Sequence, residues 1–119
     1  MALEFFCGAF TGQNDTNNQA VTGVGFKPKA VFFYYMQTVD QDAATVCQIG
    51  VGAAVPATSH FASWYVSAEG ASSNTARMWS NTRCLLGTDI AGTVVAAADF
   101  VSFDDDGFTV DWTTATAAV

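Results

Sequence analysis

His60, the only histidine of the chain, directly follows Ser59, and this pair is the first place to look for acid–base chemistry. A serine and a histidine together with an acidic residue could form a hydrolytic triad. Neighbouring residues at the start of a strand point to opposite faces, however, and no serine lies in a nucleophile-elbow pattern. We therefore interpret His60 as a structural or interface residue, and we expect no catalytic residue and no enzymatic activity.

The acidic run Asp104, Asp105 and Asp106 is the second candidate site. Its carboxylates are the oxygen ligands that Ca²⁺ prefers, so these three residues are weak candidates for a metal site. The run lacks the DxDxDG spacing and the later glutamate of an EF-hand. A solvated turn is the favoured interpretation, and we expect neither a bound metal nor a cofactor.

Trp64 and Trp79 offer a third kind of chemistry, because exposed aromatic rings can stack on the apolar faces of sugars. Packing in the core is the favoured interpretation for each ring, since large aromatics dominate the cores of β-sandwiches. The stretch GVGFKP lacks the GK[ST] ending and the following helix of a phosphate-binding loop. No nucleotide site is expected there.

The three cysteines, Cys7, Cys47 and Cys84, lie in apolar stretches without any CxxC pair. This spacing argues against a zinc site and against a compact disulfide framework. We expect buried free thiols, as in a protein made in a reducing cytoplasm.

Size and composition indicate one domain, residues 1–119, that works in contact with other subunits. Half of the residues are hydrophobic and only 13% are charged, where about 25% is typical. Part of the exterior must therefore be neutral or apolar, which favours a homo-oligomer. The net charge of −7 disfavours nucleic acids as partners. Glu4 near the start and the lack of a long apolar run predict neither secretion nor a membrane span.

Alternation of apolar and polar residues recurs along the chain, whereas helical periodicity does not. The pattern predicts an all-β fold, a two-sheet antiparallel β-sandwich or jelly roll of eight or nine short strands. A short helical turn is conceivable at residues 40–45. The predicted strands are residues 4–10, 19–23, 30–36, 46–53, 60–67, 75–80, 83–87, 94–103 and 108–115.

The stretch from Pro28 to Met36 is predicted to be a strand that is apolar on both sides. Proline cannot donate to a β-ladder, so Pro28 sets where pairing begins. One side, with Phe33 at its centre, can fill the core, and the other needs an adjacent subunit. The few cations of this acidic chain are expected at subunit contacts. The predicted interface residues are Lys27, Lys29, Phe32, Tyr34, Arg77 and Arg83.

The last hairpin, FVSFDDDGFTVDW, is the clearest local prediction. Phe108, Val110 and Trp112 alternate with polar residues, so they share one face and Trp112 should lie in the core. Gly107 ends the turn and suits a positive φ. The first predicted strand contains FFCGAF. Terminal strands of sandwiches often pair, and both this strand and the last one are hydrophobic enough to be held in the fold.

Two stretches together carry a resemblance to a known family. They are GVGFKPKAVFFYY, through Gly25, Phe26, Pro28, Ala30 and Val31, and DGFTVDW, through Gly107, Phe108, Val110 and Trp112. The chain resembles short β-sandwich structural proteins of tailed bacteriophages. It is also similar in arrangement to H-type lectins, small trimeric sugar-binding sandwiches, although no sugar-contact residue carries over from them.

The phage resemblance implies a virion protein that is assembled in the cytoplasm of the host bacterium. Its implied role is that of a capsid decoration or cement protein, which stabilises the head by bridging capsid subunits. The implied partners are its own copies, with a trimer favoured, and the major capsid protein or other virion proteins. The alternative is a carbohydrate-binding module of a tail tip or fibre, with glycans as ligands. A secreted adhesin is a poorer third interpretation.

Overall fold

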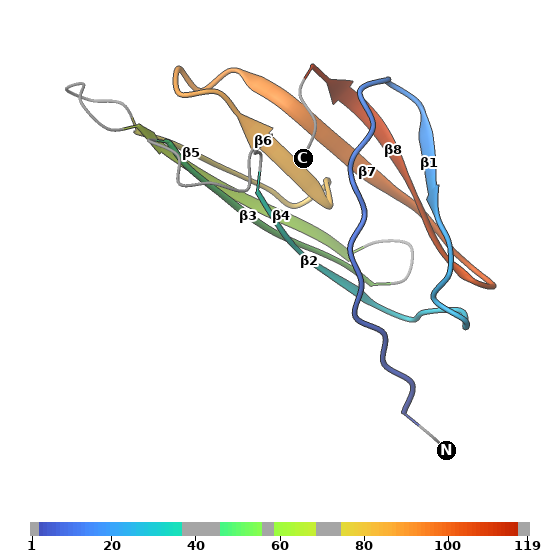
Figure 1. The fold of residues 1–119 in the computed structure, drawn as a ribbon. Helices are drawn as coiled ribbons and strands as arrows, with labels where there is room; N and C mark the ends of the chain where they lie inside the picture. The colour runs from blue at the N-terminus through green and yellow to red at the C-terminus, as the bar shows by residue number, and fades with distance from the viewer. Residues whose placement is uncertain (1–2, 37–45, 56–58, 69–74, 117–119) are drawn as a thin grey trace.

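The computed structural model describes residues 3–36, 46–55, 59–68 and 75–116 (Figure 1). Within these residues the chain forms eight β-strands in two antiparallel four-stranded sheets, and no helix (Figure 1). This confirms the predicted all-β, two-sheet sandwich. The helical turn considered at residues 40–45 lies outside the described residues. No described segment is a helix long and apolar enough to cross a membrane.

Each sheet combines strands from different parts of the chain. The first sheet has the order β1 (Asn18–Val21), β8 (Gly107–Ala115), β7 (Val94–Asp104) and β6 (Leu85–Thr88). The second sheet has the order β2 (Val31–Tyr35), β3 (Val46–Val55), β4 (Ser59–Ala68) and β5 (Thr75–Ser80). These eight strands match eight of the nine predicted ones within a few residues at their ends.

The predicted strand at residues 4–10 is wrong. Residues 3–10 form an extended segment that enters no sheet and makes no backbone hydrogen bond to another described residue (Figure 1). The free side of β8, where a first strand would pair, is taken by β1, which lies later in the sequence. Only the end of the segment is tied down: the ring of Phe10 packs edge-to-face on Phe33 and Phe108, at centroid distances of 6.0 and 5.8 Å.

Small residues on β3 allow the two sheets to come close together. Its buried positions are Gly50, Gly52 and Ala54. A Cβ on Gly52 would lie 1.9 Å from the carbonyl oxygen of Cys84, so the two backbones are in direct contact. Gly50 makes room for the rings of Tyr35 and Trp64, which stack at 5.8 Å. The sequence GVGA thus forms a strand because its neighbours supply the bulk that it lacks.

The last hairpin agrees with the prediction. Asp104 pairs with Gly107 at the end of β7 and β8, and Phe108, Val110 and Trp112 are buried in alternation. Trp112 is 1% exposed, and its Nε1 donates to Gln19 Oε1 at 2.7 Å. Gly107 has a φ of 157°, and a Cβ there would lie 1.9 Å from the carbonyl oxygen of Val21. Glycine is therefore required mainly because the backbone of β1 passes so close.

Candidate functional site

The outer surface of the second sheet is the most unusual surface of the molecule. Antiparallel sheets with one solvated side normally carry polar residues on that side. Here the cross-strand register aligns, from edge to edge, Tyr34, Val51, Ser63 and Trp79, and beside this row Phe32, Ala53 and Phe61. We define the apolar face as Phe32, Tyr34, Ile49, Val51, Ala53, Val55, Phe61, Tyr65 and Trp79.

The most exposed side chains of the apolar face lie at the edges of the sheet. Phe32 is 72% exposed, Trp79 69% and Tyr34 63%. They stand on β2 and β5, with less exposed side chains between them on β3 and β4. Alternation along β2 explains the exposure: Phe33 and Tyr35 turn inward to the core, so Phe32 and Tyr34 must turn outward. The prediction that this strand is apolar on both sides is confirmed.

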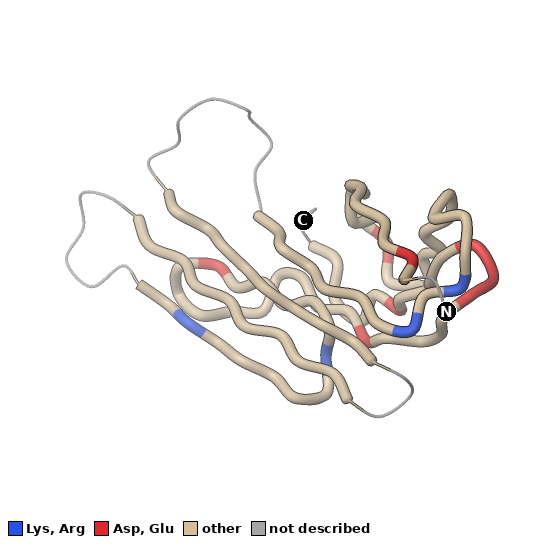
Figure 2. The backbone as a smooth tube through the Cα atoms, turned by 90° about the horizontal axis from the view of Figure 1, so that it is seen from below, with Lys and Arg blue, Asp and Glu red and all other residues tan. Residues whose placement is uncertain are grey.

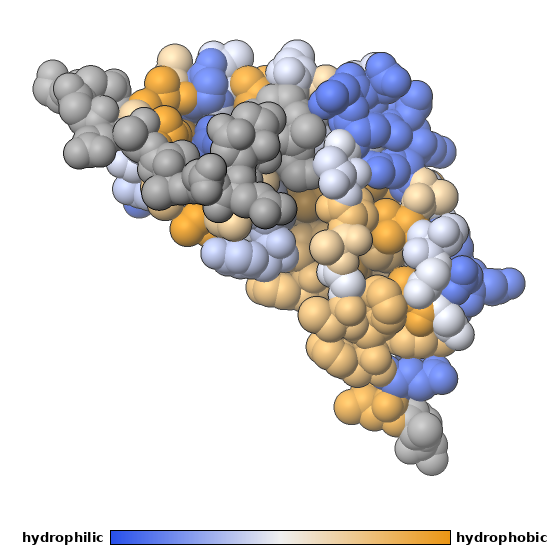
Figure 3. Space-filling model, viewed as in Figure 1, coloured by the Kyte–Doolittle hydropathy of each residue, from blue (hydrophilic) through white to orange (hydrophobic). Residues whose placement is uncertain are grey.

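Charge is nearly absent from this sheet. None of the strands β2, β3, β4 and β5 contains an acidic residue, and Arg77, which lies opposite Tyr65, is their only lysine or arginine. The strands that face the viewer in Figure 2 are accordingly almost entirely tan, the colour of residues other than Lys, Arg, Asp and Glu. Figure 3 shows hydrophobic atoms gathered along the N-terminal segment and hydrophilic ones over the loop before β1.

The predicted interface residues fall into two groups. Phe32, Tyr34 and Arg77 share the outer surface of the second sheet. Lys27 and Lys29 are exposed on the loop before β2, and Arg83 is half-buried between β5 and β6. The structure therefore brings three of these six residues together on one surface.

The two tryptophans proposed as sugar ligands differ completely in their surroundings. Trp64 is 1% exposed, and its Nε1 donates to the carbonyl oxygen of Thr88 at 3.1 Å. It presents no ring face to a ligand, because Tyr35 stacks on it in the core. Trp79 is exposed and belongs to the apolar face.

The acidic run holds the loop before β2 in place. The backbone N–H groups of Gly23 and Gly25 donate to the two carboxylate oxygens of Asp106, at 2.9 and 2.6 Å. These bonds favour the ionised carboxylate and lower the pKa of Asp106. Gly23 and Gly25 have φ values of 89° and 83°, which only glycine adopts without strain. The GVGF stretch and the DDDG turn are thus one structural unit.

Asp104 has partners of its own within the hairpin. Ser102 Oγ and Thr109 Oγ1 each donate to its carboxylate at 2.7 Å. These two bonds, with a smaller contribution from the charge of Lys27, lower the pKa of Asp104. Asp105 is exposed at the turn. Within the described part of the chain, no three acids, histidines or cysteines come close enough to hold a metal ion.

His60 and Ser59 point apart, as expected for strand neighbours. Ser59 is exposed, whereas the half-buried His60 ring packs edge-to-face on Phe100 at 5.7 Å. No hydrogen bond joins the His60 ring to a serine or an acid among the described residues. The geometry of a triad is absent at this position.

Only one of the three cysteines is buried. Burial raises the pKa of the Cys84 thiol to about 12, and this thiol lies 3.4 Å from the carbonyl oxygen of Ala98. Cys7 and Cys47 are free and exposed, which corrects the prediction that all three are buried. Cys7 is exposed because its segment forms no strand, and Cys47 lies near the start of β3, beyond the main core.

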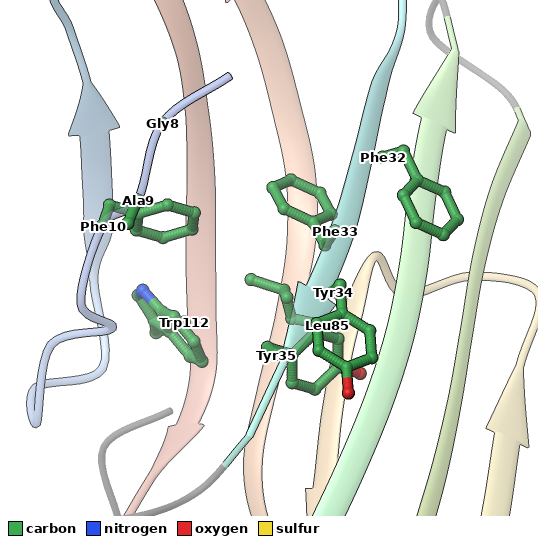
Figure 4. A pocket seen from close by; sticks show the side chains of 9 residues that line it. All are labelled: Gly8, Ala9, Phe10, Phe32, Phe33, Tyr34, Tyr35, Leu85 and Trp112. Carbon is green, nitrogen blue, oxygen red and sulfur yellow. The ribbon is translucent and has the colours of Figure 1, made fainter. Parts of the chain in front are cut away.

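A cavity of about 150 Å³ lies between the sheets, where the N-terminal segment passes β2 and β8 (Figure 4). Tyr35 lines it, and the Tyr35 hydroxyl donates to the carbonyl oxygen of Leu86 and accepts from the Leu86 N–H, both at 2.9 Å. Burial raises the pKa of Tyr35 to about 12. The described lining residues are Gly8, Ala9, Phe10, Phe32, Phe33, Tyr34, Tyr35, Leu85 and Trp112. The lining contains no acid, base or thiol, so this space suits an apolar group and supplies no reactive one.

Three further residues of the apolar face were not predicted as site residues: Ile49, Val51 and Phe61. Alternation on the predicted strands at 46–53 and 60–67 puts them on one side of each strand, but only the strand pairing joins them to Phe32 and Tyr34. Phe5 was missed for a different reason, because it was assigned to a paired strand at residues 4–10, and Leu3 lies just before that strand.

Comparison of the chain with protein-family models, curated proteins and solved structures finds no match.

Proposed function

We propose that the protein is a non-enzymatic structural subunit that acts by assembling through its apolar face, in the role of a capsid decoration or cement protein of a tailed bacteriophage. The apolar face is the observation that carries this proposal. On this sheet surface Phe32, Tyr34 and Trp79 are more than half exposed, so the free energy falls when another protein covers it.

The magnitudes favour assembly with many contacts. Burial of a large apolar side chain contributes about 1.5–3 kcal/mol, so three such anchors contribute roughly 5–9 kcal/mol. Association of two proteins costs about 4–15 kcal/mol in lost translational and rotational freedom. A single contact through this face is therefore marginal, whereas repeated contacts on a particle or in a closed ring add up. A cement protein works in this way.

The opposite surface supports one orientation of the subunit. On the first sheet Asp99 lies directly opposite Asp111, and Asp111 opposite Asn18. Like charges on two such surfaces repel each other, so copies of the chain avoid contact through this sheet. We infer that the apolar face lies against neighbouring subunits and the shell, while the acidic surface faces solvent.

The virion role itself is supported by the phage resemblance. The two stretches that carry it meet in space through the hydrogen bonds of Gly23 and Gly25 to Asp106. Electron microscopy of phage heads incubated with the purified protein tests this role. We expect ordered density at capsid joints, and heads that survive heating longer. Density on the tail alone, or none at saturating protein, would contradict it.

The assembly step is tested separately with Tyr34→Ser/Trp79→Ser, two exposed changes at opposite edges of the sheet. Light scattering after size-exclusion chromatography should show an oligomer for the parent chain and a folded monomer for the variant. Thr113→Ser, an exposed change on the first sheet, should leave the oligomer intact. An unchanged oligomer in the double variant would overturn the assignment of the apolar face.

Sugar binding is a second candidate because the exposed Trp79 ring is available for stacking. A glycan array with and without calcium, read for the parent and for Trp79→Ala, separates the two functions. Saturable binding that is lost in Trp79→Ala would favour the carbohydrate-binding module.

A further inference from the structure

The N-terminal arm, which we define as residues 3–10, is anchored at one end and uncovered at the other. Phe10 packs in the core, whereas Leu3 is 97% exposed and Phe5 87%. The arm extends beyond the sandwich (Figures 1 and 3). An extended apolar segment that has no backbone partner among the described residues gains both hydrogen bonds and apolar contacts when it meets another surface.

The arm makes few of these contacts within its own chain. The ring of Phe6 folds over Gly8, where an added Cβ would lie 2.5 Å from it, and it stays about half exposed. Leu3 and Phe5 lie beyond this local contact. The surface that could cover them must therefore be apolar and must lie elsewhere.

The apolar face has the complementary properties. It is a wide hydrophobic surface whose strands carry no acid and only one lysine or arginine, Arg77. The arm carries one charge, the acid Glu4, between Leu3 and Phe5. When one neutral surface carries a single acid and the other a single base, the attraction between them favours one relative orientation of the two surfaces.

We propose that the N-terminal arm of one copy lies across the apolar face of a second copy, with Leu3 and Phe5 on its aromatic side chains and Glu4 beside Arg77. This inference rests on the proposed function and names the partner of the apolar face. Exchange of arms between copies joins them without any change in the sandwich itself.

The arm does not cover the apolar face of its own chain, because Leu3 and Phe5 are 97% and 87% exposed. The end of the arm passes β2, and Arg77 lies on β5, three strand positions from β2 in the sheet. That separation is roughly 14 Å at the usual strand spacing. From the anchor at Phe10, the seven residues from 3 to 9 span at most about 24 Å. This length is enough to cross the sheet of a neighbour that packs beside the arm.

Replacing the apolar side chains of the arm is the first test. Leu3→Ser/Phe5→Ser should raise the dissociation constant of the oligomer, measured by sedimentation equilibrium, about ten- to hundredfold. Val101→Ser is the matched control, because Val101 is an exposed apolar residue on the first sheet. An unchanged constant for the arm variant would overturn the inference. If Tyr34→Ser/Trp79→Ser still dissociated the oligomer, the proposed function would stand, with the faces packed on each other.

Charge exchange is the sharper test of the register. Glu4→Lys and Arg77→Glu should each weaken association about fivefold, and the double variant should recover most of the loss. Asp105→Lys and Arg83→Glu change the net charge equally at other sites and should show no such recovery. Additive losses in the double variant would overturn the pairing. If the two charge changes were also coupled in the free energy of unfolding of fully dissociated monomers, arm exchange would be overturned, because the arm would then lie on its own sheet.

Discussion

The outer surfaces of the two sheets are opposites, although their inner surfaces are alike. Inward, each sheet buries one tryptophan and at least one phenylalanine, Trp112 with Phe100 and Phe108 on the first sheet and Trp64 with Phe33 on the second. Outward, the first sheet presents Asp99, Asp111 and threonines, and the second presents the apolar face. Folding needs only the inner pattern. The difference between the outer surfaces is therefore best explained by what each surface meets after folding.

The largest expected effect separates the inner surfaces from the outer one. Trp64→Ala and Trp112→Ala each leave a cavity in the core and should lower the free energy of unfolding by about 3–5 kcal/mol. Trp79→Ala should change the free energy of unfolding of the monomer by no more than about 0.5 kcal/mol. Urea unfolding followed by circular dichroism measures all three. A loss at Trp79 as large as the other two would mean that the apolar face belongs to the monomer's own core.

Glycines at close backbone contacts test whether the two sheets are equally constrained inside. Gly52→Ala and Gly107→Ala each place a Cβ against a carbonyl oxygen, of Cys84 and Val21 respectively. Each should lower the free energy of unfolding by about 1–3 kcal/mol, because backbone must shift. Gly92→Ala, where only the positive φ opposes the change, should cost about 1 kcal/mol. Equal losses at all three, in urea unfolding, would refute the close-contact argument.

Acid should affect the hairpin side of the molecule through Asp106. Its pKa is lowered in the folded state, so its contribution is present above the unfolded pKa of about 3.9 and is lost as pH falls through the folded value. Asp106→Asn should therefore flatten the fall in stability on the acid side of pH 4, as measured by thermal unfolding at a series of pH values. Asp105→Asn, which removes the same charge from the exposed turn, is the control. Parallel curves for Asp106→Asn and the parent would contradict the prediction.

Thiol labelling gives the smallest effect and leaves the fold unchanged. Cys7 and Cys47 are exposed and should react quickly with Ellman's reagent at pH 8, whereas the buried Cys84, with its pKa raised to about 12, should react only on unfolding. In the oligomer, arm exchange should slow Cys7, since its segment would be covered. A native chain in which all three thiols react at one rate would contradict the core position of Cys84.

Most of the fold was predictable because alternation fixes which side chains turn inward. Phe33, Val110 and Trp112 were placed correctly on that basis, and so was the outward turn of Phe32 and Tyr34. The strand at residues 4–10 was not predictable in the same way. Its pattern fits a strand, but a strand needs a partner, and the free side of β8 is taken by β1. The exposure of Cys7 follows from the same competition.

The sequence by itself determined the all-β class, the alternation on each strand and the low charge of the chain, because these depend on residue type and local spacing alone. Tertiary structure alone decided that Trp64 is buried while Trp79 is exposed, and that Gly23 and Gly25 meet Asp106. It also gathered the outward residues of β2, β3, β4 and β5 into one surface. Such outcomes depend on which strands pair and which sheets stack, and pairing is settled by contacts between residues far apart in the chain.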